Sequence, residues 1–353
     1  MTARNNTAAN FPAGWKPAAS PASGAPASGA PASASRRSRL AGAAVLGVAA
    51  LAAAGALAGG AGRADAAVLT NCAPTPGTCG YPSATTTGVP AGTTLTSVPS
   101  QVTSGPGWSW NATTNTVVVT GNGTVLSGLS ISGTLQVSAS NVTVKNVQVV
   151  TGGNFGISLT HTVGVTIQNS TISGLNSTTG RVGSAIDDVY GDSTGMTLKY
   201  NNISNFKTAI QISTGLVDSN YIHDPGYMAG DHTNGFYVNG GTQPLTIQNN
   251  TIFDPLGQTD AINLDAGTPG PGAPVANKTI KNNLLAGGSY TIYGGAAGGS
   301  PTTNIVITGN QFGQNYFPKS GQYGPVAYFD PTGAGNTWSG NTWDTTGQAV
   351  ASS

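Results

Sequence analysis

The sequence predicts an all-β fold, a parallel β-helix (a solenoid) of roughly eight to ten coils with capped ends. Two series of short repeats carry this prediction. In the first, apolar residues alternate with polar ones and an asparagine marks a corner, as in VTIQNSTI (165–172). Alternation with a period of two indicates β-strands. Further copies occur at 142–149, 196–203, 215–222, 245–252, 278–285 and 305–312.

A second series of short apolar segments lies between the copies of the first. The central apolar residues of this series are Ile157, Ile186, Ile210, Phe236, Ile262 and Ile292, with steps of 29, 24, 26, 26 and 30 residues. Repeats of roughly 20 to 50 residues are typical of solenoids. Two detected strands per repeat, without helical periodicity, favour a coiled parallel sheet. We therefore expect the first five of these residues to stack in one interior column.

Asparagines share one position of the repeat, namely Asn201, Asn220, Asn250, Asn283 and Asn310. Asparagine tolerates the left-handed backbone conformation, and its amide both donates and accepts hydrogen bonds. On coils stacked roughly 4.8 Å apart, such amides can form a ladder. The alternative is the general preference of asparagine for turns. Recurrence at one position favours the ladder.

The composition agrees with a solenoid. Glycine supplies 52 of the 353 residues, only 7% of the residues are charged, and all 12 acidic residues are aspartates. Frequent turns between short strands explain the glycine content. Low charge with much glycine is also typical of disorder, but the regular apolar positions beyond about residue 107 argue against it.

Residues 1–66 are expected to be a low-complexity region and a signal peptide that is removed on secretion. SRRSRL (35–40) supplies the basic part and partly resembles a twin-arginine export signal; an apolar run (40–60) and an Ala-Asp-Ala cleavage site (64–66) follow. The alternative is an uncleaved membrane anchor. The remaining chain has 7 basic and 11 acidic side chains, so we expect neither nucleic acid nor an anionic membrane as a partner.

Cys72 and Cys79 lie close together in a chain predicted to be exported, which favours a local disulfide. Metal binding is the weaker alternative, because no histidine or further cysteine is near in sequence. We expect residues 67–107 to cap the first coils, residues 108–345 to form the β-helix and residues 346–353 to be a tail. The aromatic residues Tyr323, Tyr328, Phe329, Trp338 and Trp343 are candidates for covering the other end.

Across residues 85–315 the chain resembles a known family. GVPAGTTL (88–95), NVTVKN (141–146), YIHD (221–224), DHTNG (231–235) and NNLLAGGSYTIYGG (282–295) follow one another as in secreted actinobacterial proteins of the pectin-lyase-like superfamily. The resemblance implies a right-handed parallel β-helix and a polysaccharide as partner. It does not choose between lyase, hydrolase and binding protein.

Nine aspartates lie between residues 187 and 265, and they supply the candidate site. The candidate catalytic residues are Asp187, Asp231, His232 and Asp260. The candidate substrate-binding residues are Asp188, Gln211, Tyr237, Asn263, Asp265 and Tyr293. Alternation along the strands places Asp187, Gln211, Tyr237, Asn263 and Tyr293 in one outward column, on which sugar rings could stack. The alternative for any single aspartate is a local turn.

Two reactions fit an aspartate-rich site. Glycoside hydrolysis needs two carboxylates beside the scissile bond, and Asp187-Asp188 with His232 resembles the polygalacturonase pattern. The chain departs from that pattern: it has no NTD before the two aspartates, no GHG around His232 and no arginine after Arg181. A lyase needs a base and a cation such as Arg181, Lys199, Lys207 or bound Ca²⁺. The non-enzymatic alternative is a glycan-binding or structural surface protein.

Overall fold

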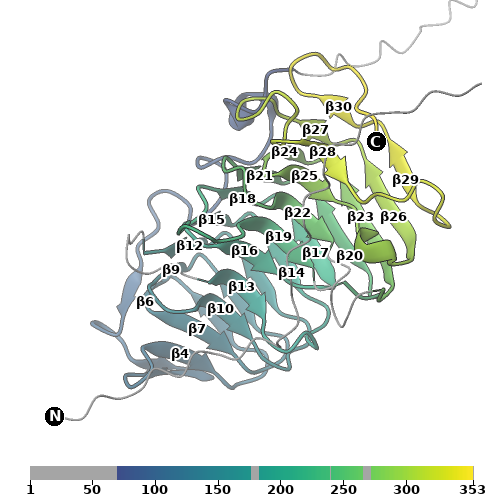
Figure 1. Ribbon diagram of the computed structural model, residues 1–353. Coiled ribbons are helices and arrows are strands. Elements are labelled where there is room, and N and C mark those ends of the chain that lie inside the picture. Colours follow the sequence, from purple (N-terminus) through teal and green to yellow (C-terminus); the bar gives the residue numbers. More distant parts are fainter. Residues whose placement is uncertain (1–69, 176–182, 239, 265–271, 353) are drawn as a thin grey trace, which may run out of the picture. The chain divides into compact units, whose positions relative to one another are not determined.

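Three long parallel sheets form a β-helix (Figure 1). The computed structural model describes residues 70–175, 183–238, 240–264 and 272–352. Each coil passes through the sheets that we name C, A and B, in that order. In the described residues, eight complete coils run from β5–β6–β7 to β26–β27–β28, with partial coils at both ends. The predicted fold class is therefore confirmed.

The strands are short, and their bounds are as follows. Sheet A contains β1 (Thr96–Val98), β6 (Leu129–Ser132), β9 (Gln148–Thr151), β12 (Thr171–Gly174), β15 (Asn202–Ser204), β18 (Tyr221–His223), β21 (Thr251–Asp254), β24 (Leu284–Gly287), β27 (Gln311–Phe312) and β30 (Thr342–Trp343). Sheet B contains β2 (Ser104–Gly105), β3 (Trp108–Asn111), β4 (Thr116–Val119), β7 (Thr134–Val137), β10 (Phe155–Leu159), β13 (Ser184–Asp188), β16 (Thr208–Gln211), β19 (Asn234–Val238), β22 (Asp260–Leu264), β25 (Tyr290–Tyr293) and β28 (Gly324–Ala327). Sheet C contains β5 (Val125–Ser127), β8 (Thr143–Lys145), β11 (Thr166–Gln168), β14 (Thr197–Lys199), β17 (Gly215–Asp218), β20 (Leu245–Gln248), β23 (Val275–Lys281), β26 (Thr302–Thr308) and β29 (Thr337–Ser339). Two short 3-10 helices, η1 (Pro76–Cys79) and η2 (Ala297–Gly299), complete the described elements.

A coil has three strands where the sequence pattern revealed two. The first repeat series bends at its asparagine corner, so VTIQNSTI supplies β11 to sheet C and β12 to sheet A. The second series supplies sheet B. The strands on either side of the corner are only three or four residues long, which is why one alternating pattern covers both.

The interior column predicted from the second series is confirmed. Parallel register pairs Ile157, Ile186, Ile210, Phe236, Ile262 and Ile292 in succession across sheet B. All six side chains are fully buried. Burying a side chain of this size stabilises the fold by about 2 kcal/mol.

The asparagine ladder is also confirmed, and it extends one coil further than predicted. Side-chain Nδ2 donates to Oδ1 of the asparagine on the next coil at 2.9–3.0 Å, from Asn201 through Asn220, Asn250, Asn283 and Asn310 to Asn341. Each Oδ1 also accepts the backbone N–H of the preceding asparagine, as between Asn250 and Asn220 at 2.8 Å. The ladder therefore satisfies buried polar groups at the corner of sheets C and A.

At the corner between sheets C and A, the residue that precedes the ladder asparagine, or its equivalent on earlier coils, has a left-handed backbone. We name this set the corner column: Asn146, Asn169, Tyr200, Ser219, Asn249, Asn282, Gly309 and Gly340, with φ between 48° and 66°. Glycine and asparagine adopt this conformation readily, whereas tyrosine rarely does. The bend reverses the side-chain direction, so that the ladder amides face inward and corner residues such as Tyr200 are exposed.

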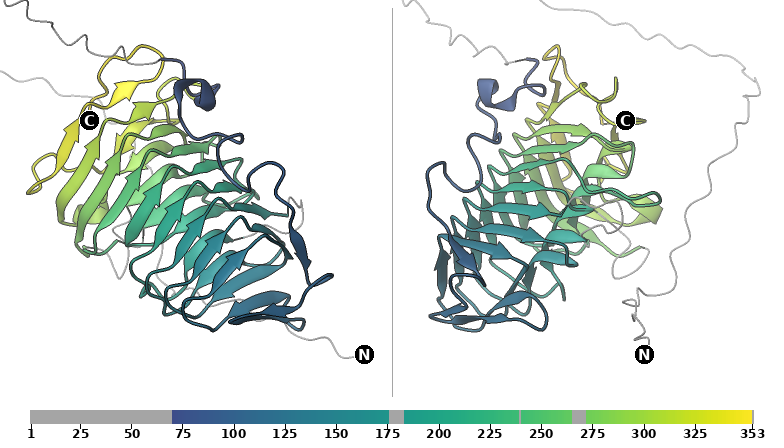
Figure 2. Two further views of the ribbon diagram at one scale, coloured as in Figure 1. Left: turned by 180° about the vertical axis from the view of Figure 1, so that it is seen from behind. Right: turned by 90° about the vertical axis from the view of Figure 1, so that its left-hand side faces the viewer.

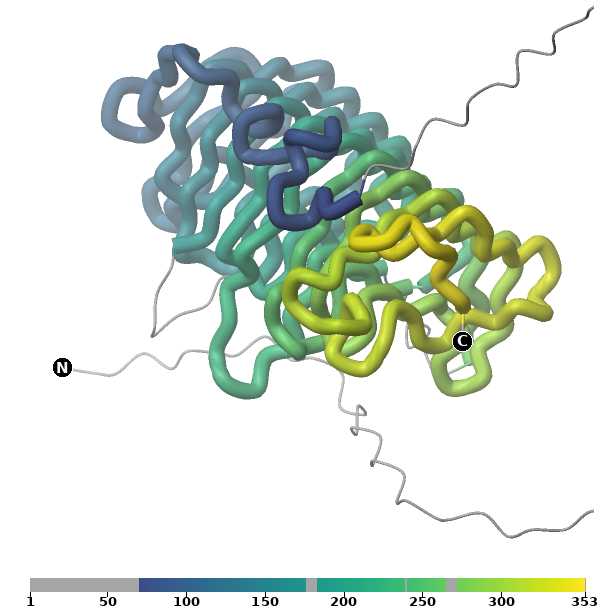
Figure 3. The backbone as a smooth tube through the Cα atoms, turned by 90° about the horizontal axis from the view of Figure 1, so that it is seen from above, coloured from purple at the N-terminus to yellow at the C-terminus, as the bar shows by residue number. Residues whose placement is uncertain are grey.

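The disulfide Cys72–Cys79 is present, as predicted, but it lies away from the first coils. We name residues 71–88 the strap; it runs along one side of the stack (Figures 2 and 3). At one end, the backbone N–H of Cys72 donates to Asp344 Oδ1 at 2.7 Å. At the other end, Gly88 N donates to the Tyr200 carbonyl at 2.8 Å. Of the residues predicted to form the N-terminal cap, β1 and β2 lie at the first coils, whereas the strap does not.

The last coil is closed by aromatic residues and by the predicted tail. Trp338 and Trp343 pack against Phe312, and Val350 is part of the core. Trp338 Nε1 donates to the Val350 carbonyl at 2.7 Å. These contacts cover the apolar end of the solenoid, which would otherwise expose strand edges.

Candidate functional site

The outward column predicted on sheet B exists. Register pairs Asp187 with Gln211, Gln211 with Tyr237, Tyr237 with Asn263, and Asn263 with Tyr293. Adjacent strands are about 4.8 Å apart, so the column is about 19 Å long. A carboxylate, two amides and two phenol rings thus form one continuous stripe on the outer face.

Four tyrosines gather at the C-terminal end of this stripe. The ring centroids of Tyr290 and Tyr293 are 5.7 Å apart, those of Tyr290 and Tyr323 are 5.9 Å apart, and those of Tyr293 and Tyr328 are 5.8 Å apart. We name these four residues the tyrosine cluster. Tyr323 and Tyr328 are 58% and 53% exposed. The sequence analysis placed Tyr323 and Tyr328 among residues covering the solenoid end, but they extend the outer face of sheet B.

Asp187 is a buried carboxylate at the other end of the stripe, only 6% exposed. Burial raises the pKa of Asp187 to about 6, the Ser184 hydroxyl opposes this shift through a hydrogen bond, and the charge of Asp188 adds to it. A carboxyl group of this kind exchanges its proton near neutral pH, as general acids and bases do.

Asp188 does not join the outward stripe. Register pairs it with Leu159, an interior residue, and its carboxylate accepts the backbone N–H of Ser193 at 3.1 Å. Burial is the main cause that raises the pKa of Asp188. Asp188 thus holds the turn after β13, which is the local role considered as an alternative for single aspartates.

Asp260 is joined to the stripe through Asn263. Asn263 Nδ2 donates to Asp260 Oδ2 at 3.0 Å, and the Asp260 carboxyl is fully buried. Burial raises the pKa of Tyr293, and the Asp260 charge raises it further. Tyr293 therefore keeps its phenolic proton and can donate a hydrogen bond to a ligand.

His232 contacts Thr259, the residue before Asp260. His232 Nδ1 lies 3.1 Å from Thr259 Oγ1, and Thr259 immediately precedes Asp260. Thr259 has a φ of 33°, a strained conformation for a β-branched residue. Strain of this kind concentrates at functional sites.

Asp231 is turned toward its own loop, where Oδ2 accepts the Met228 N–H at 2.9 Å. Asp187 lies three strands from Asp260, about 14 Å along the sheet. The structure thus places His232 against the residue before Asp260, while Asp187 lies three strands away from Asp260. Asp265, the remaining candidate, lies outside the described residues.

The candidate cations come from different parts of the chain. Lys199 is on β14 of sheet C, Lys207 precedes β16, and Arg181 lies outside the described residues. Within the described ranges, no three His, Cys or Asp side chains are arranged to hold a metal ion. Ca²⁺ binding stays a prediction.

Asp254 is a buried carboxylate outside the candidate site residues. It is 1% exposed, and its Oδ2 accepts the Thr233 hydroxyl at 2.7 Å, directly behind His232. Burial raises the pKa of Asp254 to about 7. Its Oδ1 accepts the backbone N–H of Leu256 at 3.1 Å, which is the local turn expected for a single aspartate.

We expect Asp254→Asn to flatten the pH dependence of folding. Because the pKa of Asp254 is higher in the folded protein, its stabilising contribution is complete at pH values below about 4 and is lost as the pH rises through about 7. The loss amounts to about 4 kcal/mol. Urea denaturation at pH 4.5 and 8 should therefore show a smaller fall for Asp254→Asn than for the wild type. A change at Asp330, whose pKa is lowered by hydrogen bonds from Thr332, should leave the fall in place. An equal fall in the Asp254 variant would contradict the assignment.

Comparison with known proteins found no matching protein-family model, no matching curated protein and no matching solved structure. In the described part of the chain, no helix has the length and apolar character to cross a membrane. The structure by itself establishes an all-β parallel solenoid carrying one disulfide.

Proposed function

We propose that this chain is a secreted β-helix protein of the pectin-lyase-like kind, which binds an extracellular polysaccharide along the outer face of sheet B. The observation that carries the proposal is the continuous stripe from Asp187 to Tyr293 with the tyrosine cluster at its end. The predicted signal peptide and the disulfide support an extracellular location.

The chemistry of the stripe suits a sugar polymer. Tyrosine rings offer apolar faces, while their hydroxyl groups remain polar. Gln211 and Asn263 have amides that both donate and accept hydrogen bonds, as sugar hydroxyls do. Because the stripe crosses five strands, an extended ligand could contact several coils at once. A ligand of one or two rings would use only part of it.

Cleavage of the bound polymer is the second candidate function. The raised pKa of Asp187 and the contact of His232 with strained Thr259 favour it. The separation of Asp187 from Asp260, about 14 Å by strand count, exceeds the roughly 5 to 10 Å that paired carboxylates need in hydrolysis. Proton transfer by one group, as in a lyase, fits this spacing better. A non-catalytic binding protein or structural surface protein needs only the stripe.

Binding is tested by affinity electrophoresis of residues 67–353 in gels containing plant, algal or bacterial polysaccharides. We expect retardation by at least one polymer, and a Kd about fivefold higher or more for Tyr237→Ala and Tyr328→Ala, since each removes a stacking ring. Tyr190→Ala is the matched control, because Tyr190 is 64% exposed but lies after β13, outside the stripe. The proposal would be contradicted if no polymer retarded the wild-type protein. It would also be contradicted if the stripe variants were retarded as strongly as the wild type.

The same incubations distinguish the reactions. Absorbance near 235 nm reports the unsaturated products of a lyase, and new reducing ends without that absorbance report hydrolysis. If products form, Asp187→Asn or His232→Ala should slow turnover at an unchanged melting temperature. Binding without products assigns the protein to the non-catalytic class.

A further inference from the structure

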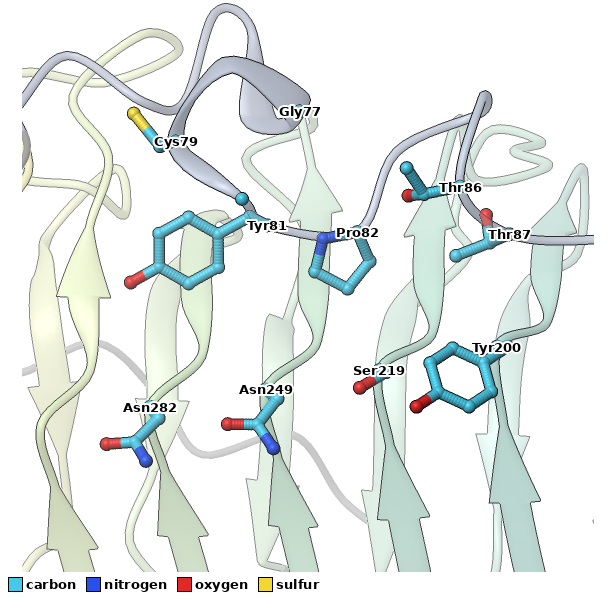
Figure 4. A pocket seen from close by; sticks show the side chains of 11 residues that line it. Gly77, Cys79, Tyr81, Pro82, Thr86, Thr87, Tyr200, Ser219, Asn249 and Asn282 are labelled. Atoms are coloured by element: carbon cyan, nitrogen blue, oxygen red, sulfur yellow. The ribbon is translucent and has the colours of Figure 1, made fainter.

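A pocket of about 440 Å³ lies between the strap and the corner column (Figure 4). Tyr81 and Pro82 extend from the strap on one side. On the other side, Tyr200, Ser219, Asn249 and Asn282 come from four successive coils. Its volume is within the range of small-molecule sites, which is about 300 to 1,000 Å³.

The fold itself keeps the pocket open. The strap is anchored to Asp344 at one end and to the Tyr200 carbonyl at the other. Between these anchors Tyr81 packs against a cluster that contains Phe253 and Leu284 of sheet A. Other strap side chains bond within the strap, as when the Thr87 hydroxyl donates to the Ser83 carbonyl at 2.7 Å. The strap therefore has a local structure of its own and crosses the corner column as a bridge.

The lining has the chemistry of a site for an uncharged, hydroxyl-rich ligand. Asn249 and Asn282 present amides and Ser219 presents a hydroxyl. Asp218 Oδ1 already accepts from Ser219 Oγ and from Asn249 Nδ2, each at 2.9 Å, so these two residues offer a ligand mainly their oxygen acceptors, while the Asn282 amide can both donate and accept. Two phenol rings stand at the two ends, and no acidic or basic side chain lines the pocket. Burial raises the pKa of Tyr81 to about 12, and Asp344 adds to the shift, so its hydroxyl remains a donor.

Tyr200 gives an independent indication of function. It is in the left-handed conformation with a φ of 56°, although asparagine or glycine occupies most of the corner column. Tyrosine at such a position costs conformational energy, and its ring is 42% exposed. The backbone alone would favour asparagine there, so the ring is best explained by a contact that it makes beyond the fold.

From these observations we infer that the strap pocket is a second carbohydrate-binding site, which takes one or two rings of a neutral saccharide between Tyr81 and Tyr200. It lies at the corner of sheets C and A, whereas the stripe lies on sheet B. The inference does not rest on the function proposed for the stripe.

The test uses saturation-transfer NMR on residues 67–353 with the disulfide intact. Glucose, galactose, mannose, cellobiose and maltose serve as millimolar probes. We expect at least one to receive saturation and to give a measurable Kd. The double variant Tyr200→Asn with Asn282→Gly should raise that Kd about tenfold. Both changes introduce residues that the corner column already contains, so folding should be preserved.

Two control variants make the result specific. Asn146→Gly changes the same column two coils away from Tyr200, and Tyr237→Ala changes the sheet B stripe. Both should leave the Kd unchanged. The inference is overturned if no probe binds, if the double variant binds as the wild type does, or if only Tyr237→Ala weakens binding.

Discussion

Replacing Ile210 with aspartate should abolish folding of the β-helix at neutral pH. Ile210 is fully buried between Ile186 and Phe236 in the sheet B column. An unpaired carboxylate in such a place costs several kcal/mol, and the total stability of a domain is typically about 5–15 kcal/mol. Far-ultraviolet circular dichroism and thermal denaturation measure the loss. A melting temperature within a few degrees of the wild type would show that the column is not interior.

Two controls separate the effect of burial from that of charge. Ile210→Val removes one methylene group and should lower the stability by only about 1 kcal/mol. Thr279→Asp places the same charge on sheet C between buried neighbours, but its side chain is half-buried and faces outward. It should therefore fold.

The second large effect is expected from Asn250→Ala. Asn250 Oδ1 accepts the backbone and side-chain N–H groups of Asn220, at 2.8 and 3.0 Å. Asn250 Nδ2 donates to the Val217 carbonyl and to Asn283 Oδ1, at 3.1 and 3.0 Å. All of these bonds are buried, and each group left without a partner costs about 1–3 kcal/mol. We expect a loss of about 3 kcal/mol or more, measured by urea denaturation.

Asn249→Gly is the matched control for the ladder. It changes the adjacent corner residue, keeps the left-handed conformation and leaves every ladder bond intact. Its stability should fall by no more than about 1 kcal/mol. If the two variants were equally stable, the ladder would contribute little beyond an ordinary turn.

The interior column and the ladder could be predicted because every coil repeats them at the same place. Their side chains alternate between the two faces of a strand. The orientation of a residue on one coil therefore predicts the orientation of the equivalent residues on adjacent coils. The third strand was hidden because β11 and β12 share one apolar pattern across the corner. Asn341 was missed for a related reason: tryptophans replace the aliphatic residues of the repeat in NTWSGNTW (336–343).

Less of the candidate site could be predicted, because turns reorient side chains. Alternation correctly placed Asp187 and Tyr237 in one column. The rule does not reveal the role of Asp188, which points inward as alternation requires but holds a turn through Ser193. The rule fails for Tyr323, which is outside the strands and reaches sheet B from an irregular segment. Periodicity carries no information on such segments.

The anchoring of the strap to Asp344 bears on how the chain reaches its native state. In a solenoid each coil contacts only its neighbours, so the coils at an end can fray one at a time. Here Cys72, near the start of the described chain, bonds to a residue 272 positions later, on the last coil. That contact cannot form until the C-terminal coil exists, however early residue 72 is synthesised. Strap docking is therefore a late step in assembly, and once complete it couples fraying of the last coil to release of the strap.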